Sequence, residues 1–235
     1  MHLALRTIFS LWIAVVTLPM LAQTNVQAPD NMAKRMQACT TCHGAQGITS
    51  NQAYFPRIAG KPAGYLFNQL QNFKEGRRHY GLMVVMVEHL SDAYLLDMAQ
   101  YFANLDLPYQ NPAPLKTPAS DASLQFGKTL SLQGDKSRNI PACTSCHGAA
   151  LMGVQPAIPA LLGLPRDYLA GQLGAWQTGL RRGHAPDCMG RIAKMLQPTD
   201  VDAVANWLAS QPVPAYTKAA ASLPEPLVEK CGGVK

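Results

Sequence analysis

Two short motifs in the sequence carry thiol and imidazole groups at fixed spacing. The first is Cys39-Thr40-Thr41-Cys42-His43 and the second is Cys143-Thr144-Ser145-Cys146-His147. C-x-x-C-H is the attachment signature of c-type haem, in which Cys39, Cys42, Cys143 and Cys146 would bond the porphyrins and His43 and His147 would bind the irons. A redox dithiol or half of a zinc site is the alternative use of such a pair. Each pair has its own histidine and its own downstream methionine, which favours two haem groups over one shared zinc ion.

The sequence around the two motifs is duplicated. The matched segments are Phe55-Pro56 with Ile158-Pro159, Tyr65-Leu66 with Tyr168-Leu169, Gln69-Leu70 with Gln172-Leu173, and Gly76 with Gly179. Two copies of a unit of about 90 residues indicate two domains, because a solenoid needs at least three repeats.

A second axial ligand for each iron must lie far enough downstream to reach the other face of the haem. Met83 and Met189 occupy equivalent positions of the two repeats, each just before a terminal helix. Methionine is usually core filler, but this equivalence makes both the expected ligands, and thioether ligation gives a high reduction potential. Met86 is expected in the core because its repeat partner is Ile192, and Met195 is a weaker alternative to Met189.

The pattern between the motifs is helical. Apolar residues recur at three- and four-residue spacing over 94–105 and 201–208, and Ser91 is placed to cap the first of these helices. A shorter helix is expected to lead into each cysteine motif, over 33–39 and over 124–132. Alternating β-branched runs do not occur in the sequence, so the fold is expected to be all-α.

The first 22 residues are expected to form a signal peptide. His2 and Arg6 precede an apolar run from Ile8 to Ala22, which is the order of a secretory signal and shorter than a usual membrane span. Cleavage is expected between residues 22 and 28, and an uncleaved membrane anchor is the alternative. The chain is therefore expected in the periplasm, where free thiols oxidise or are used covalently.

The composition argues against several other classes of protein. There are 20 Lys and Arg against 14 Asp and Glu, a net charge of +6, yet charged residues make up only 14% of the 235, below the usual ~25%. The sequence has neither a basic patch of the kind that binds a phosphate backbone nor a glycine-rich phosphate-binding motif. Nucleic-acid and nucleotide binding are therefore not expected.

In its motifs the sequence resembles the dihaem cytochrome c4 family, over nearly the whole chain that follows the signal peptide. Besides the duplicated C-x-x-C-H, the marks are Phe55-Pro56-x-x-x-Gly60, Tyr65-Leu66-x-x-Gln69-Leu70 with Gly76-Arg77-Arg78, Leu90-Ser91-Asp92 and Met189-Gly190-Arg191-Ile192-Ala193. The resemblance implies two tandem cytochrome c-like domains packed face to face, each with one covalently bound haem c. It implies haem propionates near the interface and irons held by His43 with Met83 and by His147 with Met189. In that family the first methionine of a Met-x-x-Met pair is the ligand, which matches Met83.

The expected domain order follows from the repeats and from composition. It is a signal peptide over 1–22, a first cytochrome c domain over 29–107, a proline-rich linker over 108–120, a second domain over 121–211 and an irregular tail over 212–235. The prolines of the linker predict a semi-rigid, extended segment.

Two cysteines outside the haem motifs depart from the family pattern. Cys188 directly precedes Met189, and Cys231 lies in the tail. An exported protein should not keep both free, so we expect a disulfide between them, which by the chain-entropy model stabilises by roughly 3–4 kcal/mol. The alternative is that Cys188 is itself an iron ligand, whose thiolate would lower the reduction potential.

Paired arginines also recur in both repeats, as Arg77-Arg78 and Arg181-Arg182. They are expected either at solvated helix ends, where cations suit the helix dipole, or in contact with haem propionates or an acidic partner.

The expected function is electron transfer. An iron with both axial positions filled exchanges one electron and offers no site for substrate, so we expect an electron carrier and not an enzyme. The leading hypothesis is a carrier between a quinol-oxidising complex of the bc1 type and a terminal oxidase or reductase. The alternative is the cytochrome subunit of a periplasmic dehydrogenase complex, and a haem peroxidase would require one iron to lose its methionine. The sequence leaves open a peripheral association with the membrane.

Overall fold

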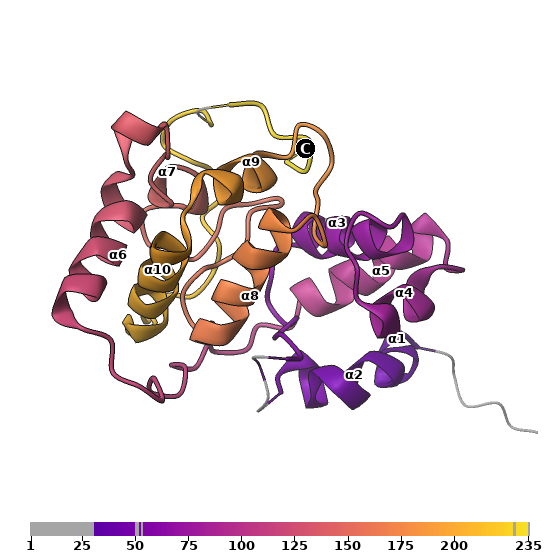
Figure 1. Cartoon of the computed structure of the whole chain (residues 1–235). Helices are drawn as coiled ribbons and strands as arrows, with labels where there is room; N and C mark the ends of the chain where they lie inside the picture. The colour runs from indigo at the N-terminus through magenta and orange to yellow at the C-terminus, as the bar shows by residue number, and fades with distance from the viewer. Residues whose placement is uncertain (1–30, 50–51, 53, 228, 235) are drawn as a thin grey trace, which may run out of the picture. The chain divides into compact units, whose positions relative to one another are not determined.

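Helices joined by long loops form the regular structure of the chain. The computed structural model describes residues 31–49, 52, 54–227 and 229–234 (Figure 1). Among these residues there are isolated β-bridges but no strands, so the predicted all-α fold is confirmed. The expected signal peptide and its cleavage region lie outside the described residues. None of the described helices combines the length and the apolarity needed to cross a bilayer.

The first repeat contains two short consecutive helices, of which the second holds the cysteine motif, and three helices after them. The helices are α1 (Met32–Arg35), α2 (Gln37–His43), α3 (Ala63–Lys74), α4 (Gly81–Val87) and α5 (Asp92–Ala103). Ser91 caps α5 by accepting a hydrogen bond from the Tyr94 amide, as predicted. The single helix expected over 33–39 is wrong, because the chain turns at the fully buried Met36 and forms α1 and α2 instead.

The second repeat follows the same plan (Figure 1). Its helices are α6 (Asp121–Gln133), α7 (Thr144–His147), α8 (Arg166–Gln177), α9 (Cys188–Met195) and α10 (Pro198–Ser210). By the repeat pattern, α8, α9 and α10 correspond to α3, α4 and α5. The Ser120 side chain caps α6, and Gln197 with Asp200 forms a capping box that starts α10.

Each repeat has its own hydrophobic core. In the first, α3 packs against α5 around Leu66, Phe73, Leu95 and Phe102. In the second, α10 packs against both α6 and α8. The residues buried there include Leu130, Leu162, Tyr168, Val204, Trp207 and Leu208.

The crossing of α6 and α10 depends on a glycine. A Cβ atom at Gly127 would lie 2.1 Å from the Ala203 carbonyl oxygen and 2.9 Å from the Trp207 Cβ. Only a residue without a side chain therefore lets the two helix backbones approach this closely.

Replacing Gly127 with valine is expected to lower the free energy of unfolding by about 2–3 kcal/mol, because overpacking forces α6 away from α10. Gly171, in α8, is the matched control, since nothing lies within 4 Å of a Cβ built there. Gly171→Ala should be neutral or add up to about 1 kcal/mol. Denaturant unfolding of both variants checks this, and equal effects would contradict the tight crossing.

The segment between the repeats is tied to the first repeat where it begins. The buried Arg57 side chain donates hydrogen bonds to the carbonyls of Leu107 (2.6 Å) and Pro108 (2.9 Å). The guanidinium also stacks on the Tyr109 ring, with its carbon 4.0 Å from the ring centroid. These contacts fix the path by which the chain enters the proline-rich segment.

Candidate haem sites

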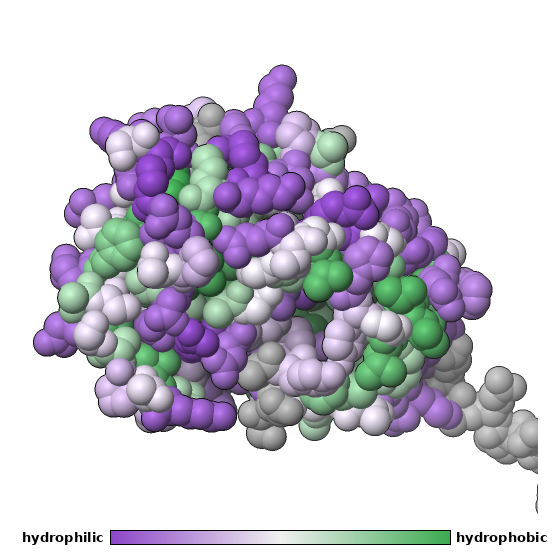
Figure 2. Space-filling model, in the orientation of Figure 1, coloured by the Kyte–Doolittle hydropathy of each residue, from purple (hydrophilic) through white to green (hydrophobic). Residues whose placement is uncertain are grey.

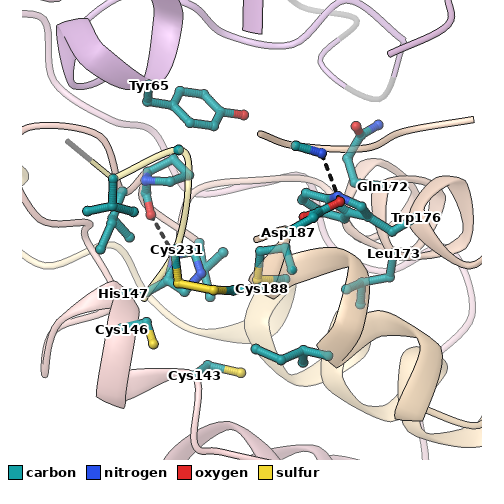
Figure 3. Close-up of a pocket in the computed structure, with 18 of the residues that line it drawn as sticks. Tyr65, Cys143, Cys146, His147, Gln172, Leu173, Trp176, Asp187, Cys188 and Cys231 are labelled. Atoms are coloured by element: carbon teal, nitrogen blue, oxygen red, sulfur yellow. Dashed lines mark hydrogen bonds between the residues drawn. A yellow bond between two sulfur atoms is a disulfide. The ribbon is translucent and has the colours of Figure 1, made fainter. Parts of the chain in front are cut away.

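Each cysteine motif opens onto its own cavity. The first cavity, of about 250 Å³, is lined by Cys39, Cys42, His43 and Met83 among others. The second, of about 230 Å³, is lined by Cys143, Cys146, His147 and Met189, and Figure 3 shows part of its lining. The structure therefore brings each predicted set of haem residues together in one place.

The histidines of the two motifs are held in the same way. His43 in α2 and His147 in α7 are both buried, and each has its Nδ1 2.8 Å from a backbone carbonyl, that of Pro56 and that of Pro159 respectively. Because a carbonyl only accepts, Nδ1 must donate, which leaves the Nε2 lone pair available for a metal. Burial lowers the pKa of both histidines, which favours the neutral, ligating form.

The motif thiols do not have the properties of a redox dithiol. Burial raises the pKa of Cys39 and Cys146, and it raises the pKa of Cys143 to about 11. A reactive dithiol needs a lowered thiol pKa instead. Nor does any group of three or more His, Cys, Asp or Glu side chains in the described part of the chain form a metal site. The dithiol and zinc alternatives therefore have no support in the geometry.

The two expected methionine ligands lie on equivalent helices. Met83 is in α4 and Met189 is in α9, and each lines the cavity of the histidine from its own repeat. Met195 packs beside the Ile140 cluster and does not line the second cavity. The expectation that Met86 is a core residue is wrong, since it lines the first cavity at its edge and is 45% exposed.

The loop before α9 is anchored at the cavity. The Asp187 carboxylate accepts hydrogen bonds from the amides of Gly183 (2.8 Å) and Gly190 (2.9 Å). A Cβ at Gly190 would lie 2.5 Å from this carboxylate, so a side chain directly after Met189 would displace it. Asp187 thus fixes the first turn of α9, which carries the methionine.

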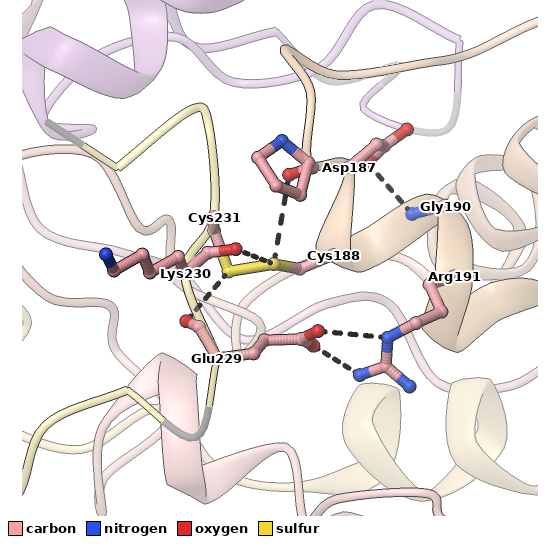
Figure 4. Close-up of a disulfide and its surroundings, with 8 residues drawn as sticks. Asp187, Cys188, Gly190, Arg191, Glu229, Lys230 and Cys231 are labelled. Atoms are coloured by element: carbon pink, nitrogen blue, oxygen red, sulfur yellow. Dashed lines mark hydrogen bonds and ion pairs between the residues drawn. A yellow bond between two sulfur atoms is a disulfide. The ribbon is translucent and has the colours of Figure 1, made fainter.

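Cys188 and Cys231 are joined in a disulfide (Figure 4). Their sulfur atoms are 2.07 Å apart, and the sequence separation is 43 residues. A disulfide sulfur is not a thiolate, so this arrangement does not support the alternative in which Cys188 is an iron ligand.

A shared group of residues lies between the two cavities. Within the described chain, the residues that line both are Lys61, Tyr65, Gln69, Tyr168, Gln172 and Arg181. The two cavities are therefore neighbours, separated by side chains of α3 and α8, of the loop before α3 and of the loop after α8.

Two arginines from equivalent positions of the repeats meet in this shared wall. Arg78 donates to the side-chain oxygens of Gln69 (3.0 Å) and Gln172 (2.7 Å). Arg181 donates to the same two oxygens, at 3.0 and 2.7 Å. The backbones of the two arginines form an antiparallel bridge. Arg78 and Arg181 are therefore not solvated helix ends, which was one of the two expectations for the paired arginines, whereas Arg182 is exposed.

The wall between the cavities carries excess positive charge. Arg181 is only 4% exposed, and none of the described carboxylates forms an ion pair with it or with Arg78. Burial lowers the pKa of Arg181, and the nearby charge of Arg78 lowers it further. Burial acts to raise the pKa of Tyr65, but Arg181, Arg78 and Lys61 outweigh it and bring that pKa down to about 8. Such a site favours an anion.

The residues present fit a covalently bound haem. The thiols and the histidine of one motif face each mainly apolar cavity, and the positively charged wall suits propionate groups. The buried Trp176 Nε1, beside the second cavity, has no hydrogen-bond partner in the protein, and a buried donor of this kind is rarely left unpaired. The shared glutamines were not singled out from the sequence as site residues, although their recurrence at matched positions was the available signal.

Comparison with known proteins also supports covalently bound haem. Residues 127–212 match the family model "Cytochrome c". The chain is 39% identical over 185 residues to the thiosulfate dehydrogenase electron acceptor of Thiomonas intermedia, which covers 79% of this chain and 83% of that protein.

Two solved structures are also similar. The crystal structure of reduced recombinant cytochrome c4 from Pseudomonas stutzeri matches with a TM-score of 0.62 and 30% identity, over 75% of this chain and 95% of that one. The thiosulfate dehydrogenase TsdBA from Marichromatium purpuratum matches with a TM-score of 0.65 and 31% identity, over 74% of this chain. The match spans only 36% of the TsdBA chain, so it is a likeness to part of that enzyme. With its two haem-binding repeats, the chain belongs to the cytochrome c4 family, whose members are electron carriers with covalently bound haem c.

Proposed function

We propose that this cytochrome works in the periplasm, where it accepts electrons from a dehydrogenase of the thiosulfate-oxidising class and passes them to the respiratory chain. The observation that carries the proposal is the shared wall, which places two haem-binding cavities side by side in one chain. The name of the Thiomonas relative and the partial match to TsdBA support the choice of donor. The predicted signal peptide supports the location.

The chain's own residues make the two sites suited to electron transfer. When bound, each haem supplies one-electron exchange at its iron. His43 with Met83 and His147 with Met189 line the same cavities; they would hold the two irons and would leave no position at either metal for substrate. The apolar cavity walls exclude water, so little rearrangement accompanies a change of charge. These features favour an electron carrier over a haem enzyme.

An apolar surface surrounds the edge of the first cavity. Leu82 and Val85 in α4 are 61% and 69% exposed, and Tyr54 and Leu180 are exposed beside them. Leu82, Tyr54 and Leu180 also line the cavity, and α4 carries no ionisable side chain. Figure 2 shows hydrophobic residues gathered over the α4 region. Exposed apolar patches of this kind mark interaction sites, so we infer that the donor docks here.

Placing lysine at both Leu82 and Val85 is expected to slow electron transfer from the dehydrogenase at least tenfold, since the charges would have to be desolvated on docking. Leu96→Lys is the matched control, because Leu96 is exposed on α5 of the same repeat and does not line the cavity. Stopped-flow reduction at several protein concentrations measures the rate. An undiminished rate in the double variant would place the docking surface elsewhere.

The donor itself is tested by direct reduction. The oxidised holoprotein is mixed with a thiosulfate dehydrogenase and thiosulfate, and separately with a quinol-oxidising complex and quinol. Faster reduction by the dehydrogenase is expected. The second candidate, a general carrier from a bc1-type complex to a terminal oxidase, is favoured by the match to 95% of a cytochrome c4 structure. Reduction by the quinol-oxidising complex alone would establish that candidate instead.

A further inference from the structure

The end of the chain crosses the second repeat beside α9. We call residues 229–234 the C-terminal strap. The disulfide between Cys188 and Cys231 ties it to the first residue of α9, and Glu229 pairs with Arg191 one turn later, with Nε 3.0 Å from Oε2 (Figure 4). The Gly232 amide donates to the Pro186 carbonyl at 3.0 Å. The strap is therefore attached along its length to the segment that carries Met189.

The strap also reaches the first repeat. The Asn68 side chain, in α3, donates a 2.6 Å hydrogen bond to the Gly233 carbonyl. At Gly232 the approach is close, because a Cβ there would lie 2.2 Å from the Ala185 carbonyl oxygen. Only glycine lets the strap pass so near the loop before α9.

The strap forms part of the wall of the second cavity. Cys231, Gly233 and Val234 line this cavity together with Met189 and His147. Figure 3 shows the disulfide among the residues that line the cavity with Cys143, Cys146 and His147. Lifting the strap would therefore expose the cavity on the side of α9.

In the first repeat, α4 corresponds to α9, and none of the described residues forms a similar strap across its surface. Leu82 and Val85 occupy the repeat positions of Cys188 and Arg191, and both are largely exposed. In the second repeat those two positions are the attachment points of the strap. Among the described residues, only the second repeat therefore has a segment of the chain across this face.

We propose that the C-terminal strap is a permanent lid on the methionine side of the second haem pocket, and that the Cys188–Cys231 disulfide positions Met189 by fixing the residue before it. The second iron then keeps its methionine and is shielded from small ligands. Electron transfer to and from other proteins then takes place at the uncovered face of the first repeat. This inference does not depend on which protein supplies the electrons.

The test uses the holoprotein and two ways of releasing the strap. Cys188→Ser with Cys231→Ser removes the disulfide, whereas Gly232→Val keeps both cysteines and pushes the strap away from Ala185. Gly233→Ala is the matched control, because the nearest atom to a Cβ there is Asn68 Nδ2 at 3.6 Å. Carbon monoxide binding to the reduced protein and the far-red absorption band of methionine-ligated ferric iron are measured for each.

The double serine variant should bind carbon monoxide at half of its haem groups and lose up to half of the far-red band. Gly232→Val, which keeps the disulfide, should show the same changes to a smaller extent, while the parent protein and Gly233→Ala bind none. Far-ultraviolet circular dichroism checks that the helices remain. If both variants keep the full band and bind no carbon monoxide, the strap is not a lid. Binding at all of the haem groups would also overturn the proposal, since it would show a general loosening that is not confined to the second pocket.

Discussion

Replacing Met83 with histidine is expected to lower the reduction potential of the first haem by on the order of 0.2 V and to leave the second haem nearly unchanged. Thioether ligation raises the potential, and axial ligands as a class set haem potentials over a range of about 0.8 V. Met83 shares its cavity with His43, whose ligating nitrogen is left free by the bond to Pro56. A spectroscopic redox titration resolves the two haem groups.

Met86 provides the matched control for that experiment. It lies one helical turn after Met83 in α4 and lines the same cavity, but it is 45% exposed. Met86→His should leave both potentials within a few tens of millivolts of the parent, as expected for a neutral change outside the ligand sphere. If Met86→His gave the large shift and Met83→His did not, the ligand assignment from the repeat would be wrong.

The second large effect on the reduction potentials is expected when Arg181 is replaced. Arg181→Leu removes a buried positive charge from the wall shared by both cavities. A positive charge disfavours the oxidised, more positive iron, so its loss lowers both potentials. At roughly 10 Å and an effective dielectric constant of 20, one charge contributes about 1.7 kcal/mol, or about 70 mV for one electron. Potentiometric titration of both haem groups measures the shift.

The free energy of unfolding should also fall in Arg181→Leu. Arg181 donates to Gln172, Gln69 and Tyr65, at 2.7, 3.0 and 3.3 Å. Gln69 and Gln172 keep Arg78 as a donor, so only the Tyr65 hydroxyl loses its partner, and we expect the free energy of unfolding to fall by about 1 kcal/mol.

Arg182 is the matched control for this second variant. It is the next residue along the chain and carries the same charge, but it is exposed, and its side chain donates a 3.2 Å hydrogen bond to the Gly76 carbonyl. Arg182→Leu should shift the potentials by less than a third as much, because solvent screens an exposed charge. Equal shifts in the two variants would show that the buried wall has no special electrostatic role.

Covalently bound haem was predictable because it depends on local motifs and on their repetition. The two C-x-x-C-H motifs contain the predicted covalent and proximal groups, and the equivalence of Met83 and Met189 selects two of the ten methionines as the predicted further ligands. The helices α5 and α10 follow from apolar periodicity and end signals. The motifs and helices depend on neighbours within one repeat, and the methionines are found by comparing the two repeats.

Features that depend on contacts between distant segments were not predictable in the same way. The Arg78–Gln172 and Arg181–Gln69 bonds join residues 94 and 112 positions apart, and no periodicity encodes such pairs. Met86 was misplaced because its repeat partner, Ile192, is partly buried, whereas Met86 is 45% exposed. The disulfide could be inferred from export, but its place in the wall of the haem cavity required the structure.

The central claim, that two closed histidine–methionine haem sites make this chain an electron carrier, is tested most directly by the optical spectrum of the holoprotein. Ferric and ferrous spectra are recorded, and carbon monoxide is then added to the reduced form. We predict the weak far-red band of methionine–iron ligation at full strength for both haem groups and no binding of carbon monoxide. A high-spin haem, or ready binding of carbon monoxide by either haem, would contradict a methionine assignment and would favour an enzymatic or ligand-sensing role.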